Sequence, residues 1–151
     1  MKSSRIRPRA TRLKGHKERG EWAQLCFMAR AAEEGLTISC PYGDSTSYDV
    51  GVEYRGRYLR IQVKSTLKPR RGPAFRIGLI GPNGKPYTHR QIDFIAAYLI
   101  SEDCWYIVPI ASLRVGNTTL RNIQITPNSK RGKWHHYCEA WHLLRQPFKS
   151  K

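Results

Sequence analysis

The sequence has no apolar stretch approaching the roughly 20 residues that a membrane-spanning helix needs. Its first nineteen residues carry eight basic side chains and no apolar block, which argues against a signal peptide. No basic amphipathic helix stands out, so an anionic lipid surface is a poor partner. We therefore expect a cytoplasmic, nucleoid-associated protein with no membrane partner.

Cysteine is also scarce. The four cysteines, at positions 26, 40, 104 and 138, are scattered and form no C-x-x-C pair, which argues against a disulfide framework or a zinc ribbon. His135, His136, Cys138 and His142 lie close together, but no second recognisable pair accompanies them, so core or surface roles are favoured over a zinc site.

Acidic residues are few. The chain has 11 of them against 27 lysines and arginines, which gives a formal net charge of +16 over 151 residues. A merely soluble surface does not require such an excess, whereas a polyanionic partner does, because neutralised phosphates release condensed counterions. The composition therefore favours a nucleic-acid-binding protein.

The chain has the length of one domain. Residues 1–16 are dense in charge and lack apolar periodicity, which predicts a flexible basic arm preceding a single domain over 17–151. Apolar residues recur at spacings of three and four from Lys17 to Glu34, and Gly35 follows, which predicts a helix that ends there.

Two alternating segments, 48–54 and 57–64, predict a pair of amphipathic strands after a short strand at 37–40. In the second of them, Leu59, Ile61 and Val63 face the core. The opposite face then carries Tyr58, Arg60, Gln62 and Lys64.

Residues 55–56 (Arg-Gly) form a plausible two-residue hairpin loop between these strands. This loop pairs Tyr54 with Arg57 and sets a register in which Asp49 lies opposite Gln62. Directly opposed side chains project to the same face about 4.5–5.5 Å apart at Cβ, so both can hold one ion. A slip of one residue would destroy the shared apolar face, which supports the register.

The remaining apolar runs predict the rest of a sheet. Residues 75–80 predict another strand, and 92–100 and 104–110 predict two adjacent buried strands, although a short run such as 92–100 is also compatible with a helix. Apolar positions over 134–145 predict a terminal helix that packs on the sheet.

The hairpin carries the elements of metal-assisted phosphodiester hydrolysis. The Asp49 carboxylate, the Gln62 amide oxygen and the strand carbonyl near Val63 are hard oxygen ligands, which suit Mg²⁺, with Mn²⁺ as a substitute, better than zinc. Lys64 can orient water or neutralise charge that develops at the phosphate. Glu21, near the start of the first helix, can add a second carboxylate.

This pattern resembles the PD-(D/E)XK nuclease superfamily in its Q-x-K variant. The likeness runs from Lys17 to Leu144 and narrows to the endonucleases associated with group I introns, through RGEWAQLCFMARAAEEG, PYGDSTSYDVGV, RIQVKST, IDFIAAYLI, WYIVPI and EAWHLL. The resemblance implies an α/β (α+β) fold with a restriction-endonuclease-like core, a mixed central β-sheet flanked by helices. It implies duplex DNA as substrate and a catalytic set of Glu21, Asp49, Gln62 and Lys64.

The sequence departs from the superfamily pattern at two positions. Tyr48 replaces the usual proline before the aspartate, and Gln62 replaces the usual acid, which lowers the negative charge around the ion. The intron-associated family uses glutamine there, so we expect activity. Glu18 is the alternative to Glu21 as the helix ligand.

Several cations are predicted to contact DNA: Arg60, Lys68, Arg70, Arg71, Lys130, Arg131 and Lys133. Cutting two antiparallel strands calls for two active sites, so we expect a homo-oligomer, a dimer or tetramer. The leading hypothesis is a homing endonuclease. The alternatives are a Holliday junction resolvase with the same chemistry and a non-catalytic basic nucleic-acid-binding protein.

Overall fold

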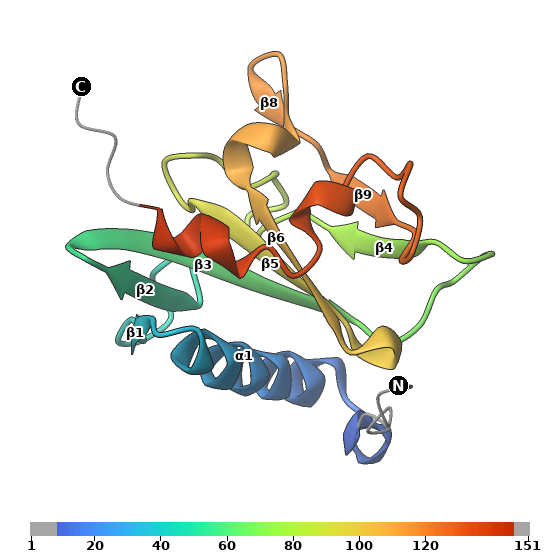
Figure 1. Ribbon diagram of the computed structural model, residues 1–151, viewed down its shortest axis with the longest axis horizontal. Helices are drawn as coiled ribbons and strands as arrows, with labels where there is room; N and C mark the ends of the chain where they lie inside the picture. The colour runs from blue at the N-terminus through green and yellow to red at the C-terminus, as the bar shows by residue number, and fades with distance from the viewer. Residues whose placement is uncertain (1–8, 147–151) are drawn as a thin grey trace.

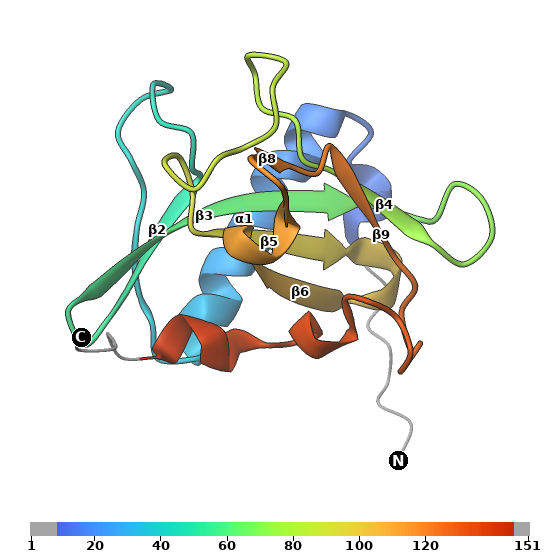
Figure 2. The same ribbon diagram turned by 90° about the horizontal axis from the view of Figure 1, so that it is seen from above.

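A computed structural model describes residues 9–146 and shows a five-stranded mixed sheet in the order β1-β2-β3-β5-β6 (Figures 1 and 2). Strands β3 and β5 are parallel, and the other neighbours are antiparallel. The strands are β1 (Thr37–Ser39), β2 (Val50–Tyr54), β3 (Arg57–Thr66), β5 (Phe94–Leu99) and β6 (Cys104–Pro109). This architecture confirms the predicted restriction-endonuclease-like fold class.

The predicted hairpin is confirmed with its register. Strands β2 and β3 pair Val50 with Ile61 and Tyr54 with Arg57. Arg55 and Gly56 have φ values of 48° and 79°, as expected for a two-residue turn whose twist matches that of the strands. The hairpin therefore turns Ile61 towards one face of the sheet and Gln62 towards the other.

One face of the sheet is covered by α1 (His16–Glu33), which lies beneath it in Figure 1. Phe27 and Ala31 of this helix are fully buried in the same cluster as Ile61 and Val63, as the apolar spacing predicted. The preceding 3₁₀ helix, Arg9–Arg12, buries Ala10 in that cluster, so this part of the predicted arm packs on the domain. Residues 1–8 of the arm lie outside the described residues.

The other face is covered by a two-stranded ribbon and not by an α-helix. The ribbon is formed by β4 (Phe75–Gly78) and β9 (Asn122–Ile125), which bury Ile77 and Ile123 against the sheet. The strand predicted over 75–80 is thus shorter than expected. Its partner β9, which we did not predict, alternates over only four residues, the shortest run that indicates a strand.

Strands β5 and β6 form the interior of the domain. All six residues of β5 are buried, because α1 covers one face of the sheet and the β4–β9 ribbon covers the other. The choice between strand and helix for 92–100 is settled by tertiary contact, since a strand buried on both faces has no alternating pattern. The 3₁₀ helix Ile100–Glu102 joins the two strands.

A further small hairpin, formed by β7 (Arg114–Val115) and β8 (Thr118–Thr119), follows the 3₁₀ helix Ile110–Leu113 and projects from the body of the domain in Figure 1. It was not predicted from the sequence. Among the described residues, no helix is both long and apolar enough to span a bilayer.

The prediction of a terminal helix over 134–145 is wrong. Two 3₁₀ helices, His135–Tyr137 and Trp141–Arg145, occupy this segment. Glu139 separates them in a left-handed conformation (φ 50°), and its backbone and carboxylate both hydrogen-bond to Trp105 of β6. The edge of β6 therefore holds the segment in an irregular path, while Trp141 still reaches the core as its spacing predicted.

Candidate active site

The antiparallel ladder of β2 and β3 ends at the pair Val50–Ile61, one residue before the predicted pairing of Asp49 with Gln62. The Asp49 backbone N–H donates to the Ile61 carbonyl at 2.9 Å. Its Oδ2 accepts a hydrogen bond from the Val63 N–H, also at 2.9 Å. The Asp49 carboxylate thus accepts the Val63 N–H in place of the β2 backbone carbonyl that would have accepted it in a longer ladder.

Beyond this point β3 has an open edge. It continues to pair with β5 as far as Thr66, while no strand formed by residues 9–146 pairs with its other side, as the right-hand part of β3 in Figure 2 shows. A strand residue directs its N–H and its C=O to the same edge. The Val63 carbonyl therefore faces the open edge beside Asp49, whose Oδ1 has no hydrogen bond to any described residue.

Gln62 and Lys64 lie on the face away from α1. Each is the register partner of a β5 residue, Ile95 and Ala97 respectively, which pack in the cluster beneath the β4–β9 ribbon. Gln62 is only 9% exposed, yet its amide makes no hydrogen bond to a described residue. No side-chain N or O atom of the described residues is both buried and unpartnered, so the Gln62 amide reaches solvent and is available to bind a ligand.

Tyr87 belongs to the same site, although we did not predict it from the sequence. The Lys64 Nζ lies 5.1 Å from the centroid of the Tyr87 ring, within the range of a cation–π contact. Tyr87 is 4% exposed, and its backbone N–H donates to Leu79. No local sequence pattern around Tyr87 indicates a role in the site, because only the tertiary structure places its ring over Lys64.

Burial shifts the acid–base properties of the site. It raises the pKa of Asp49 above its ordinary value, and the Val63 N–H and the Lys64 charge oppose this shift only in part. Burial also lowers the pKa of Lys64, against the opposing effect of Asp49. The pKa of Tyr87 is raised, first by burial and then by the Asp49 charge. A cation bound at Asp49 would compensate for the cost of the buried carboxylate.

The donor set fits a hard divalent cation. It consists of the free oxygen of Asp49, the amide of Gln62 and the carbonyl of Val63, which are the oxygen ligands that Mg²⁺ prefers. Among residues 9–146, no three His, Cys, Asp or Glu side chains gather as a metal-binding group. The metal site that these residues can form therefore combines one carboxylate oxygen with an amide oxygen and a backbone carbonyl oxygen.

The predicted helix ligand is not brought into this set. Glu21 is exposed on α1, which packs against the opposite face of the sheet, and no hydrogen bond or ion pair involving its side chain is seen in the described region. Within the described part of the chain, Lys64 is the only charged side chain that shifts the pKa of Asp49. Glu18, the alternative, is equally exposed. The assignment of a helix carboxylate therefore stays a prediction.

Arg60, predicted to contact DNA, is engaged within the protein. Its Nε and Nη2 donate to the Asp93 carboxylate at 3.0 and 3.1 Å, and further donors reach the carbonyls of His89 and Arg90. Asp93 also accepts the Arg60 backbone N–H. Four of the five guanidinium donors are thus used, so Arg60 fixes the start of β5 and has little capacity left for phosphate.

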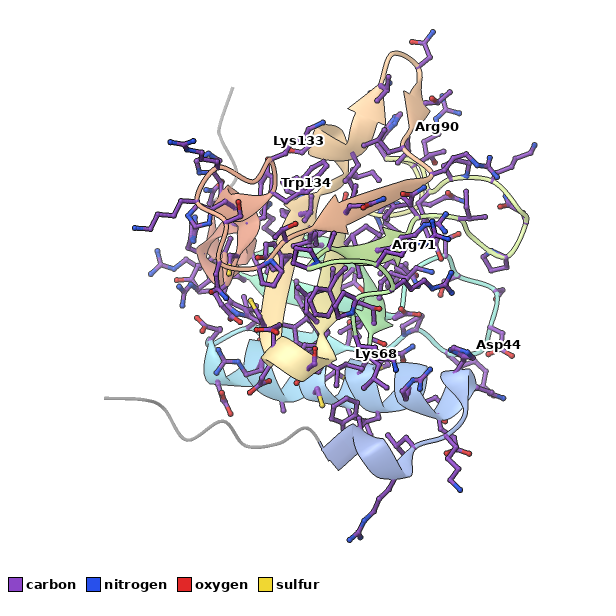
Figure 3. All side chains as sticks on the ribbon, turned by 90° about the vertical axis from the view of Figure 1, so that its right-hand side faces the viewer. Asp44, Lys68, Arg71, Arg90, Lys133 and Trp134 are labelled. Atoms are coloured by element: carbon purple, nitrogen blue, oxygen red, sulfur yellow. The ribbon has the colours of Figure 1, made fainter. Side chains whose placement is uncertain are left out.

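A basic cleft of about 490 Å³ lies beside the active site, between the start of α1 and the end of β3. We define this basic cleft by His16 and the four cationic residues Arg19, Lys68, Arg70 and Arg76. Lys68 and Arg70 were predicted to contact DNA, and Arg71 is exposed in the same loop (Figure 3).

The second predicted basic cluster is well separated from this loop. Lys130, Arg131 and Lys133 are exposed in the segment that follows β9. The Lys133 Nζ lies over the Trp134 ring, 4.9 Å from its centroid. Figure 3 shows Lys133 and Trp134 far from Lys68 and Asp44.

A carboxylate, an amide and an ammonium group thus lie together on the central hairpin of a mixed sheet, an arrangement that could hold a cation beside a phosphodiester. The chain belongs to the PD-(D/E)XK endonuclease family, whose model matches residues 15–144. The solved structure of a bacterial homing endonuclease, I-Ssp6803I, is similar, with a TM-score of 0.71 and 28% identity over 86% of this chain and 91% of that one. None of the curated proteins matches.

Proposed function

We propose that this chain is a Mg²⁺-dependent endonuclease that hydrolyses phosphodiester bonds in duplex DNA at the open edge of β3. The observation that carries the proposal is the hydrogen bond from Val63 to Asp49, which orients a carboxylate oxygen beside a strand carbonyl. The same strand supplies an amide and an ammonium group. Mn²⁺ should replace Mg²⁺, because both prefer oxygen ligands.

Asp49, Gln62 and Val63 would hold the cation, which when bound would polarise the scissile phosphate and make water a better nucleophile. The protein positions this set in advance. Asp49 is fixed through Oδ2, and Lys64 is held over Tyr87. Lys64 then presents a positive charge where negative charge develops on the phosphate, which is the larger part of catalysis at such sites.

Duplex DNA is supported as substrate by charge and by likeness. The net charge is +16, and the basic cleft adjoins the open edge of β3. The similar solved structure is that of a bacterial homing endonuclease, which supports a homing role for this chain, while the link to group I introns comes from the sequence resemblance alone. Since two strands must be cut, we propose that the active form is a homo-oligomer with two sites in use.

The test is an in vitro cleavage assay on a DNA library with Mg²⁺, comparing the intact chain with Lys64→Ala. We expect the variant to lose cleavage by about 10²- to 10³-fold, the effect typical of losing one group that stabilises transition-state charge. DNA binding should be largely retained. Lys85→Ala, in an exposed loop, is the matched control and should cut normally.

Full activity in Lys64→Ala would refute the assigned site. Preferential cutting of four-way junctions over linear duplex would instead identify a Holliday junction resolvase. Tight binding by the intact chain without any Mg²⁺-dependent nicking would identify a non-catalytic binding protein. Each outcome is read from the same set of substrates.

A further inference from the structure

The β7–β8 hairpin and the segment after Tyr87 form a second surface that the proposed chemistry does not use. They line a groove of about 290 Å³. We call this the hairpin surface and define it by Thr88, His89, Arg90, Arg114, Asn117 and Thr118. All six side chains are exposed and polar, and none is acidic.

The composition of the hairpin surface differs from that of the basic cleft. The cleft gathers four cationic side chains and one histidine, whereas the hairpin surface combines two arginines with an asparagine, a histidine and threonines. Arg90 and Arg114 form no ion pair among the described residues. Arginine pairs with guanine and asparagine with adenine through two hydrogen bonds each, and threonine contacts either hydrogen-bonding edges or the thymine methyl group.

The segment under this surface is rigidly held. Arg60 donates to the backbone carbonyls of His89 and Arg90 while it pairs with Asp93. The Thr88 N–H is bonded to the Gln91 side chain at 2.9 Å. Side chains that read base edges must be presented with little freedom, because each mispositioned contact loses its discrimination.

The hairpin surface begins one residue after an active-site residue in the chain. Thr88 directly follows Tyr87, whose ring lies against Lys64. Figure 3 shows Arg90 next to the projecting β7–β8 hairpin. The groove between them is lined by residues of the hairpin and of the segment after Tyr87. A duplex whose phosphate lies at Lys64 would therefore extend its neighbouring base pairs along this surface. The major groove is wide enough to admit a two-stranded β-ribbon.

We propose that the hairpin surface reads the base sequence of the duplex in the major groove beside the cut, with Arg90 and Asn117 as specificity-determining residues. The basic cleft, in contrast, binds phosphates without regard to sequence. The inference rests on the proposed function for the location of the DNA. It divides the cationic surface into a part that sets affinity and a part that sets sequence preference.

The test measures sequence preference and salt dependence separately, using the full chain and a randomised duplex library. Bound sequences are selected in Ca²⁺, and cut sequences in Mg²⁺. Arg90→Ala and Asn117→Ala are compared with Arg70→Ala, a control in the basic cleft. We expect each of the first two to weaken discrimination roughly 5- to 150-fold at one or two neighbouring base positions. Arg70→Ala should weaken binding to all sequences and reduce the salt slope by about 0.9.

Unchanged base preference in both Arg90→Ala and Asn117→Ala would overturn the inference, as would an intact protein that cuts without any preference. Circular dichroism of each variant confirms that it is folded. The two proposals fail separately. Sequence-selective binding without cutting would refute the proposed nuclease activity but not the base-reading role of the hairpin surface. Cutting with a sequence preference that these variants do not alter would support the nuclease activity and refute the base-reading role.

Discussion

The carboxylate of Asp49 accepts the backbone N–H of Val63 at 2.9 Å. This bond takes the place of a strand-to-strand bond at the point where β2 stops and β3 continues. It orients one oxygen of Asp49 and leaves the other oxygen beside the Val63 carbonyl. A single local departure from the ladder thus produces both the open edge and the main candidate metal ligand.

Asp49→Asn should stabilise the metal-free protein. Because burial raises the pKa of Asp49, the folded state binds more protons than the unfolded state between the ordinary and the raised value. The free energy of unfolding therefore falls as pH rises through that window. Above the window, the folded protein bears the full cost of burying the charged Asp49 carboxylate. We expect a higher Tm for Asp49→Asn than for the intact chain in EDTA near neutral pH.

The same thermal unfolding experiment tests the cation. Mg²⁺ at about one hundred times its Kd should stabilise the intact chain by about 2.7 kcal/mol. Asp49→Asn should show little of this gain, since it lacks the charged ligand. An equal Mg²⁺ effect on both proteins would place the cation elsewhere.

Tyr87 should act through its ring as a positioning residue for Lys64. Tyr87→Leu removes the cation–π contact, worth about 0.5 to 2 kcal/mol, and should lower kcat by about 2- to 30-fold with little change in KM. Tyr87→Phe keeps the ring and should retain activity. If Phe is as damaging as Leu in steady-state kinetics, the hydroxyl and not the ring is the important group.

Arg60→Met should affect stability more than DNA binding. The guanidinium and the Asp93 carboxylate are each about one-third exposed, so we expect the free energy of unfolding to fall by about 1 to 2 kcal/mol in urea titrations. The salt slope of DNA binding should be unchanged. A slope reduced as strongly as in Arg70→Ala would mean that Arg60 does contact phosphate.

Two glycines should respond in opposite directions to alanine. A Cβ at Gly20, inside α1, would meet no described atom within 4 Å outside the backbone of its own helix, so Gly20→Ala should add about 1 kcal/mol, or roughly 2–4 °C in Tm. A Cβ at Gly51 would clash with Tyr58 and lie 2.6 Å from the Ser39 hydroxyl. Gly51→Ala should therefore cost about 1 kcal/mol through the lost Tyr58 hydrogen bonds. Thermal unfolding of both variants checks the pair.

Patterns of short range predicted much of the fold. The alternation along β2 and β3 and the Arg-Gly turn were sufficient to place Gln62 and Lys64 on one face in the correct register. The spacing of apolar residues in α1 identified the helix within one residue at each end. These features depend on neighbours within one turn or one hairpin, where periodicity and turn geometry decide the structure.

Long-range contacts decided the rest. The same apolar spacing that identified α1 failed for 134–145, because Glu139 bonds to the edge of β6. Strand alternation places Arg60 on the same face as Gln62 and Lys64, which predicted that it contacts DNA. Its guanidinium instead donates to Asp93, which is 33 residues away in the chain.

The sequence by itself determined which residue types line the catalytic face, since strand alternation is a local property of the chain. Only the tertiary structure decided that Tyr87 lies over Lys64, that Arg60 is used internally, and that β7–β8 stands next to Arg90. The reason is physical: each of these depends on segments that meet through the closure of a long loop, and no local propensity encodes where such a loop ends.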